Sequence, residues 1–66
     1  MLPKPAYCIV VSTEPTMYVY CTHLEHATRV AGAINYNEEV RTVVYQYANG
    51  KIVGPMLKDY NPKVKA

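Results

Sequence analysis

At residues Thr22–Ile34 the chain reads THLEHATRVAGAI. Apolar side chains recur in this stretch with the spacing of an α-helix, at Leu24, Ala27, Ala31 and Ile34. Polar and charged residues occupy most of the other positions, so the pattern predicts one amphipathic helix. Such a helix gains most of its stability from covering its apolar stripe, and we therefore expect it to lie on a sheet.

The sequence also indicates where this helix begins and ends. Thr22 and Glu25 have the spacing of a capping box, in which each side chain accepts a hydrogen bond from the other residue's backbone N–H. No glycine follows Ile34, but the segment 35–37, Asn-Tyr-Asn, can supply a residue in the left-handed conformation. We therefore expect the helix to end near Asn35.

The segments on both sides of the helix are rich in β-branched and aromatic residues, which is typical of strands. Four strands are expected, at 6–11, 17–21, 40–47 and 51–54. Asn49-Gly50 is the preferred pair for a type I′ hairpin turn and joins the last two strands. Pro55 marks an edge strand or its end, and a short extension can follow from Met56.

The order strand, strand, helix, strand, strand predicts an α+β fold, ββαββ. One helix packs on one face of a four-stranded antiparallel sheet. The favoured sheet order is 17–21, 6–11, 40–47, 51–54. The alternative places the strand at 40–47 parallel to the strand at 17–21.

Length and composition favour one small domain. The chain has 66 residues, of which half are hydrophobic, so we expect a single domain over 1–66 with flexible ends at 1–5 and 58–66. The longest apolar run, 6–11, is far shorter than the roughly 20 residues that cross a bilayer, and no secretory signal is expected. We expect a cytoplasmic protein without membrane association.

The register of the first hairpin decides which side chains share a face. A turn centred between Glu14 and Pro15 places Cys8 opposite Cys21. In a reducing cytosol we expect free, buried thiols rather than a disulfide. Small apolar residues then face the helix, and the set predicted for this side is Cys8, Val10, Val19, Cys21, Val43, Tyr45, Ile52 and Met56.

The opposite face is predicted to be apolar and aromatic. Its expected members are Tyr7, Ile9, Val11, Tyr18, Tyr20, Val44 and Val53, interrupted by Thr42 and Gln46. A contiguous exposed apolar surface usually marks an interaction site, and tyrosine is enriched in interfaces. Two interpretations remain open: a homodimer formed by stacking two sheets, and a docking surface for another macromolecule.

Catalytic and metal sites are not expected. His23 and His26 lie three residues apart on the helix, but the sequence offers them no third ligand. No nucleophile has a recognisable base beside it, and the three glycines do not form a phosphate loop. We therefore expect a protein that is not an enzyme and that binds no cofactor.

Nucleic acid is an alternative ligand. Tyr7, Tyr18 and Tyr20 can stack bases on an open sheet, and lysine and arginine side chains can supply the surrounding charge. The net charge of +2 is too small to establish nucleic-acid binding by itself. The glycine-aromatic signature of the common RNA-recognition sheet is absent, and Ile9 and Val11 dilute the platform.

Three segments carry a resemblance to known proteins: Ala6–Val11 (AYCIVV), Thr22–Ala31 (THLEHATRVA) and Thr42–Gly50 (TVVYQYANG). In layout the chain resembles small phage-borne inhibitors of the anti-CRISPR and host-takeover type over roughly residues 6–57. The resemblance implies a non-enzymatic inhibitor that blocks a surface of a host complex, such as a CRISPR surveillance complex or RNA polymerase.

The sequence therefore predicts a binding protein whose partner is a host protein complex, which can itself contain nucleic acid. The residues predicted to contact the partner are Tyr7, Ile9, Tyr18, Tyr20, Arg41, Gln46 and Lys51. Two alternatives stay open, a small single-stranded nucleic-acid-binding protein and a structural homodimer without a separate site.

Overall fold

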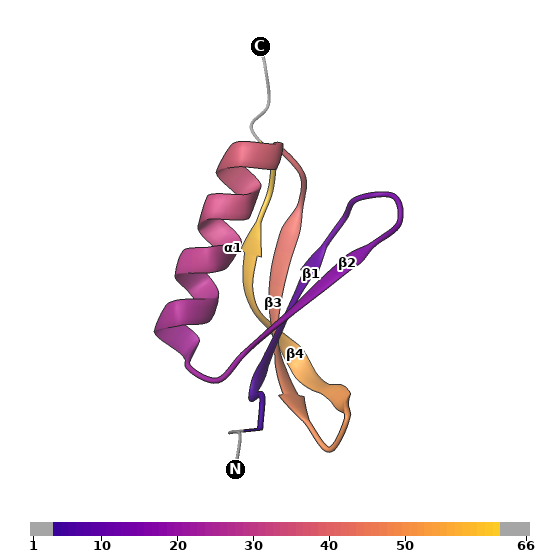
Figure 1. The fold of residues 1–66 in the computed structure, drawn as a ribbon, viewed down its shortest axis with the longest axis vertical. Helices are drawn as coiled ribbons and strands as arrows, with labels where there is room; N and C mark the ends of the chain where they lie inside the picture. The colour runs from indigo at the N-terminus through magenta and orange to yellow at the C-terminus, as the bar shows by residue number, and fades with distance from the viewer. Residues whose placement is uncertain (1–3, 63–66) are drawn as a thin grey trace.

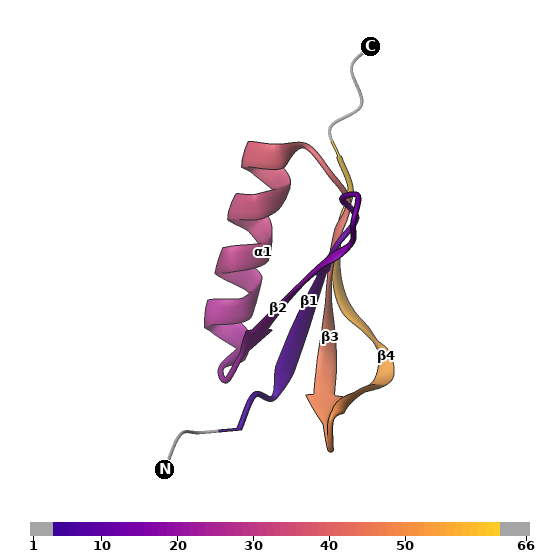
Figure 2. The same ribbon diagram turned by 45° about the vertical axis from the view of Figure 1, so that its right-hand side comes forward.

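The computed structural model describes residues 4–62 and confirms the predicted α+β class. The elements are β1 (Tyr7–Val11), β2 (Met17–Cys21), α1 (Leu24–Glu38), β3 (Thr42–Ala48) and β4 (Lys51–Tyr60). The sheet order is β2-β1-β3-β4 with every neighbouring pair antiparallel, so the parallel alternative is excluded. Figures 1 and 2 show α1 on one side of this sheet.

The helix differs from the prediction at both ends. Its N-cap is His23, which is extended and makes no side-chain capping bond, so the capping box predicted for Thr22 and Glu25 is wrong. The first helical hydrogen bond runs from Ala27 N–H to the His23 carbonyl oxygen, which moves the start of the helix one residue on. The helix also continues to Glu38 and ends at Glu39, a residue with φ of 54°.

Asn35 lies within the helix instead of ending it, and its side chain donates hydrogen bonds to carbonyl oxygens outside the helix. Its Nδ2 atom lies 2.9 Å from the carbonyl oxygen of Val40, 3.2 Å from that of Tyr60 and 3.0 Å from that of Asn61. The amide thus joins the last turns of α1 to the chain entering β3 and leaving β4. These contacts fix the end of the helix over the sheet.

The core lies between α1 and the sheet. Ala27 and Ala31 are fully buried against Ile9, Val11, Cys21 and Val44, and their small side chains let the helix approach the strands closely. Tyr60 covers one side of this core, and its hydroxyl donates to the Thr28 carbonyl oxygen at 3.1 Å. Since few side chains are fully buried, the stability of this small protein depends strongly on each of them.

The register of the first hairpin is shifted by one residue from the prediction. Tyr7 pairs with Cys21 and Cys8 with Tyr20. Five residues separate β1 from β2, so the turn is centred on Glu14 itself and not between Glu14 and Pro15. A shift of one residue exchanges the two faces of a strand.

Most of the predicted face assignments are therefore wrong. Those that hold are Tyr18 and Tyr20 on the open side and Val19 and Cys21 on the helix side. The residues predicted to be open that in fact face the helix side are Tyr7, Ile9, Val11, Thr42, Val44, Gln46 and Val53. The residues predicted to face the helix that in fact lie on the open side are Cys8, Val10, Val43, Tyr45, Ile52 and Met56.

The two cysteines consequently lie on opposite faces of the sheet. Cys21 belongs to the core beneath α1, whereas Cys8 lies on the face away from the helix. Both are free and buried, as expected, but the predicted pairing of Cys8 with Cys21 is wrong.

The second hairpin matches the sequence more closely. Asn49 and Gly50 both have positive φ, 54° and 79°, as a type I′ turn requires. Pro55 lies in the edge strand β4, next to Gly54, and the pairing with β3 is irregular here. β4 continues to Tyr60, three residues into the end predicted to be flexible from residue 58. Of the other residues in the ends predicted to be flexible, 1–5 and 61–66, residues 1–3 and 63–66 lie outside the described residues.

Gly32 provides a test of the contact between α1 and β4. A Cβ atom at this position would lie 3.7 Å from Cε1 of Tyr60, an ordinary van der Waals distance. Gly32→Ala is therefore expected to raise the free energy of unfolding by about 0.5–1 kcal/mol, because alanine favours the helix. Urea unfolding followed by circular dichroism measures this change.

Gly54→Ala is the matched control, because Gly54 has φ of 73° and alanine is strained there. This control is expected to be destabilising. A loss of stability in Gly32→Ala would show that Tyr60 packs closer to the helix than described.

Candidate functional site

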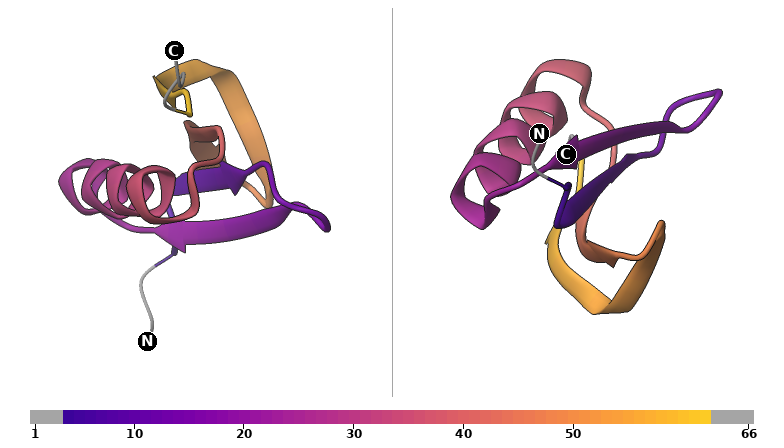
Figure 3. Two further views of the ribbon diagram at one scale, coloured as in Figure 1. Left: turned by 90° about the horizontal axis from the view of Figure 1, so that it is seen from above. Right: turned by 60° about the horizontal axis from the view of Figure 1, so that its bottom comes forward.

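The open side of the sheet carries an aromatic and aliphatic surface, which we call the tyrosine face. Figure 3 shows that the described helix lies only on the other side. The pairing of the strands assigns the following residues to the tyrosine face: Cys8 and Val10 of β1, Tyr18 and Tyr20 of β2, Val43, Tyr45 and Tyr47 of β3, and Ile52 and Met56 of β4.

Several of these side chains are strongly exposed. The exposed fractions are 55% for Tyr18, 51% for Tyr20, 46% for Met56 and 39% for Ile52. Tyrosine and methionine are among the residues enriched in protein interfaces. The tyrosine face therefore has the composition of an interaction surface.

Small residues in β1 bring two of the tyrosines together. Tyr20 of β2 and Tyr47 of β3 lie on either side of β1, where Ala6 and Cys8 leave room above the backbone. The ring centroids are 5.0 Å apart with an angle of 62° between the planes, a favourable edge-to-face arrangement. Partial desolvation raises the pKa of Tyr20, with smaller contributions from Cys8, Tyr47 and Tyr18. The hydroxyl is thus neutral at pH 7 and can donate a hydrogen bond.

Cys8 lies on the tyrosine face but is only 1% exposed. It pairs with Tyr20 on one side and with Tyr45 on the other, so the side chains of these larger neighbours surround it. Burial raises the pKa of the Cys8 thiol, which lowers the thiolate fraction and hence its reactivity.

We expect Tyr20→Ala to increase the rate of Cys8 alkylation by iodoacetamide several-fold, because the substitution removes one of the rings beside the thiol. The measurement uses a Cys21→Ala background, in which Cys8 is the single cysteine. Tyr36→Ala, which removes an exposed tyrosine from α1, is the control and is expected to leave the rate unchanged. Equal rates in both variants would contradict the position of Tyr20.

One end of the tyrosine face is closed by an ion pair. Arg41 Nη2 lies 2.9 Å from Asp59 Oδ2, and Arg41 Nε lies 3.1 Å from Asp59 Oδ1. The hydrogen bond from Arg41 lowers the pKa of Asp59, and the same bond raises the pKa of Arg41. The pair joins the start of β3 to the end of β4.

The lowered pKa of Asp59 predicts a dependence of stability on pH. The ion pair contributes to the free energy of unfolding. This contribution is fully present above 3.8, the ordinary pKa of an aspartate, and is lost as the pH falls through the lower pKa of Asp59 in the folded protein. Wild type is therefore expected to be slightly more stable than Asp59→Asn at neutral pH and equal to it in strong acid. Urea unfolding across this range measures the difference, and a constant difference would contradict the assignment.

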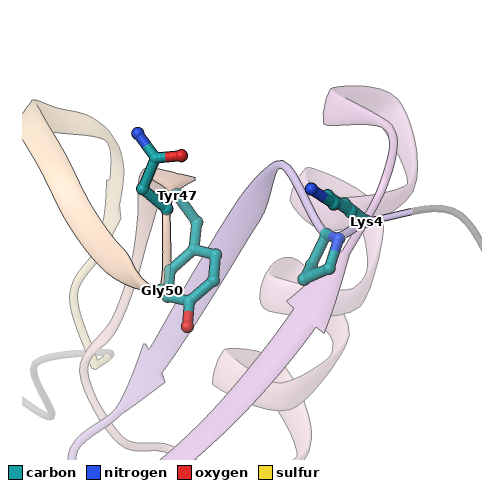
Figure 4. A pocket seen from close by; sticks show the side chains of 5 residues that line it. Lys4, Tyr47 and Gly50 are labelled. Atoms are coloured by element: carbon teal, nitrogen blue, oxygen red, sulfur yellow. The ribbon is translucent and has the colours of Figure 1, made fainter.

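The other end of the tyrosine face borders a shallow hollow with a volume of about 430 Å³. Figure 4 shows Lys4 on one side of this hollow and Tyr47 with the turn at Gly50 on the other; Pro5 and Asn49 complete its lining. An ammonium group, an aromatic ring and an amide can together receive an acidic or polar group of a ligand.

The structure brings together some of the residues predicted to bind a partner. Tyr18 and Tyr20 lie side by side on the tyrosine face with Arg41 near its end. Ile9 is fully buried and Tyr7 packs at the edge of the core, so both lie on the helix side of the sheet and neither belongs to the tyrosine face. Gln46 pairs with Tyr7 on the helix side, and Lys51 is exposed beside the hairpin turn.

Sequence reasoning missed Tyr45 and Tyr47 as members of the site. They are two residues apart in β3, so they share one face of the strand. Their spacing alone could have placed them together, but the shifted register assigned Tyr45 to the helix side.

The structure describes no metal centre. His23 and His26 are exposed at the start of α1. Within residues 4–62, no three histidine, cysteine, aspartate or glutamate side chains gather as a metal site requires. Over the same residues, no helix has the length and apolar character needed to cross a membrane.

Comparison of the chain with protein-family models, with curated proteins and with solved structures finds no match. The function is therefore inferred from the tyrosine face itself.

Proposed function

We propose that this protein acts by binding and not by catalysis, and that the tyrosine face docks on the surface of another protein. The observation that carries this proposal is the exposure of Tyr18, Tyr20, Ile52 and Met56 on the side of the sheet that the described helix leaves open. When a partner covers exposed tyrosines and the aliphatic side chains next to them, a large apolar area is buried at a small cost in side-chain entropy.

The charges around the tyrosine face favour a protein over a nucleic acid. Asp59 already neutralises Arg41 at one end, and Val10 and Ile52 interrupt the aromatic surface with aliphatic groups. A nucleic acid requires unpaired cations along its backbone. An aliphatic and aromatic protein surface requires none.

The proposed partner is a protein surface of a host complex, in the manner of the small phage-borne inhibitors that the sequence resembles. In this role the protein blocks a site that the complex needs, and it acts in the host cytoplasm. The exposed lysines Lys4 and Lys51 can increase the rate of association with an acidic partner.

A single-stranded nucleic acid is the second candidate ligand. Tyr20 and Tyr47 provide adjacent rings, and Lys4 lies across the hollow beside Tyr47. Bases that stack on these rings would place the sugar-phosphate backbone within reach of this ammonium group.

Two binding measurements separate the candidates. The first titrates a fluorescently labelled, mixed-sequence single-stranded oligonucleotide with the protein at low and at moderate salt. The proposal predicts no saturable binding, whereas affinity that falls steeply with added salt would favour the second candidate.

The second measurement captures proteins from cells of the organism that carries the gene, or from its host. Wild type and Tyr36→Ala are expected to retain the same partner, and Tyr18→Ala/Tyr20→Ala is expected to lose it. Retention by all three proteins would contradict docking through the tyrosine face.

A further inference from the structure

The two edges of the sheet differ in how well they are protected from pairing with another strand. Edge strands usually carry charges, prolines or bulges that prevent such pairing. β4 has all three, with Lys51, Lys58, Asp59, Pro55 and an irregular pairing around Gly54. β2, at the opposite edge, reads MYVYC from Met17 to Cys21 and has none of them.

The β2 edge also has exposed apolar groups on both sides. Tyr18 and Tyr20 project on the tyrosine face. Met17 lies at the start of β2, and Leu24 begins the helix three residues after β2 ends. Met17 is 46% exposed and Leu24 43%. Exposed apolar side chains on both sides of an unprotected edge strand indicate an interface.

Backbone hydrogen bonds show which groups of β2 point away from the sheet. Tyr47 N–H donates to the Ala6 carbonyl oxygen and Ser12 N–H donates to the Arg41 carbonyl oxygen, so even-numbered residues of β1 are bonded to β3. The odd-numbered residues of β1 are then bonded to β2.

The odd-numbered residues of β1 pair with Met17, Val19 and Cys21. The backbone N–H and C=O groups of Tyr18 and Tyr20 must therefore point outward from the edge. Among residues 4–62, two donors and two acceptors thus point to the outer side of β2.

We propose that β2 pairs with β2 of a second copy of this chain, antiparallel about a two-fold axis at Val19. The sequence of β2 is self-complementary about this residue, as a two-fold interface requires. Tyr18 of each copy lies opposite Tyr20 of the other, so their outward N–H and C=O groups exchange hydrogen bonds. We call this pairing of the two β2 strands the joint. No charged side chains lie opposite each other across it, because β2 contains none.

The joint creates one continuous sheet and leaves the tyrosine face open. Both helices lie on the same side of this sheet, and the two tyrosine faces join on the other side. Met17 of each copy approaches the start of the helix in the other, which covers the exposed Leu24. The inference does not depend on the proposed function, since it uses the edge of the sheet and not its face.

The mass in solution tests this inference first. Sedimentation equilibrium over a wide range of concentrations is expected to show wild type changing from monomer to dimer. Tyr18→Lys/Tyr20→Lys is expected to remain monomeric, because the joint would place like charges opposite each other. Tyr18→Lys/Tyr20→Glu is expected to dimerise again, because lysine then lies opposite glutamate.

Disulfide cross-linking tests the proposed position of the two-fold axis directly. Residues opposite each other in a non-hydrogen-bonded pair have Cα atoms about 4.5 Å apart, within the range for a disulfide. Val19→Cys in a Cys8→Ala/Cys21→Ala background is therefore expected to form a covalent dimer on mild oxidation. Ile52→Cys in the same background is the control, because β4 lies at the opposite edge of the sheet, and it is expected to form no covalent dimer under the same conditions.

Three outcomes would overturn the inference. The first is a wild type that stays monomeric at every concentration. The second is an equal loss of dimer in the Lys/Lys and Lys/Glu variants, as stacked tyrosine faces would produce. The third is a cross-link at Ile52→Cys as efficient as that at Val19→Cys. Circular dichroism of each variant confirms that the fold is retained.

Discussion

Replacing Ile9 with alanine is expected to lower the free energy of unfolding by about 2–5 kcal/mol. Ile9 is fully buried between α1 and the sheet, next to Ala27, Ala31 and Val44. The core of such a small domain rarely supplies more than about 3–5 kcal/mol in total. The variant is therefore expected to be largely unfolded at 25 °C, which circular dichroism measures.

The neighbouring residue provides a matched control. Val10 is half-buried and lies on the tyrosine face of the same strand. Val10→Ala is expected to lower the free energy of unfolding by less than about 1.5 kcal/mol, because it leaves no closed cavity. A larger loss in Val10→Ala than in Ile9→Ala would show that the two faces of β1 are exchanged.

Tyr20→Ala is expected to weaken binding of the protein partner at least tenfold, or about 1.4 kcal/mol or more, while the protein stays folded. The ring is half-exposed on the tyrosine face and contacts Tyr47 edge to face. Removing the ring takes away one contact with the partner and also the edge-to-face contact that orients the ring of Tyr47. Isothermal titration calorimetry with the captured partner measures the loss.

Tyr36→Ala is the control for this measurement, since Tyr36 is an exposed tyrosine on α1. Its affinity is expected to equal that of wild type within twofold. Unfolding of Tyr20→Ala would instead show that the ring belongs to the core. Unchanged affinity in a folded Tyr20→Ala protein would place the binding surface elsewhere.

The sequence alone allows prediction of the fold class because the local signals agree with one another. The helical spacing of Leu24, Ala27 and Ala31 and the Asn49-Gly50 turn each have one favourable interpretation. The order of the elements then leaves two sheet topologies, and the antiparallel one agrees with the structure.

The register could not be predicted because both faces of β1 are apolar. Tyr7, Ile9 and Val11 are no more hydrophobic as a set than Cys8 and Val10, so alternation does not indicate which set faces the helix. The length of the turn around Glu14 decides the question, and turn length cannot be read from propensity alone.

The prediction that the helix ends near Asn35 was wrong for a different reason. Asn35 is a residue that often ends a helix, but here its side chain bonds to carbonyl oxygens near β3 and β4. Those partners are distant in the sequence, so a local signal could not reveal them. For the same reason the contact between Tyr20 and Tyr47, across β1, could be found only from the folded structure.

The most direct test of the tyrosine face as the binding surface is site-specific photocrosslinking. A photoreactive residue is introduced as Tyr18→p-benzoylphenylalanine on the tyrosine face or as Tyr36→p-benzoylphenylalanine on α1, and the protein is irradiated in the cells where it acts. Docking through the tyrosine face predicts a covalent adduct with one partner protein from position 18 and none from position 36. An adduct from position 36 alone would contradict this account.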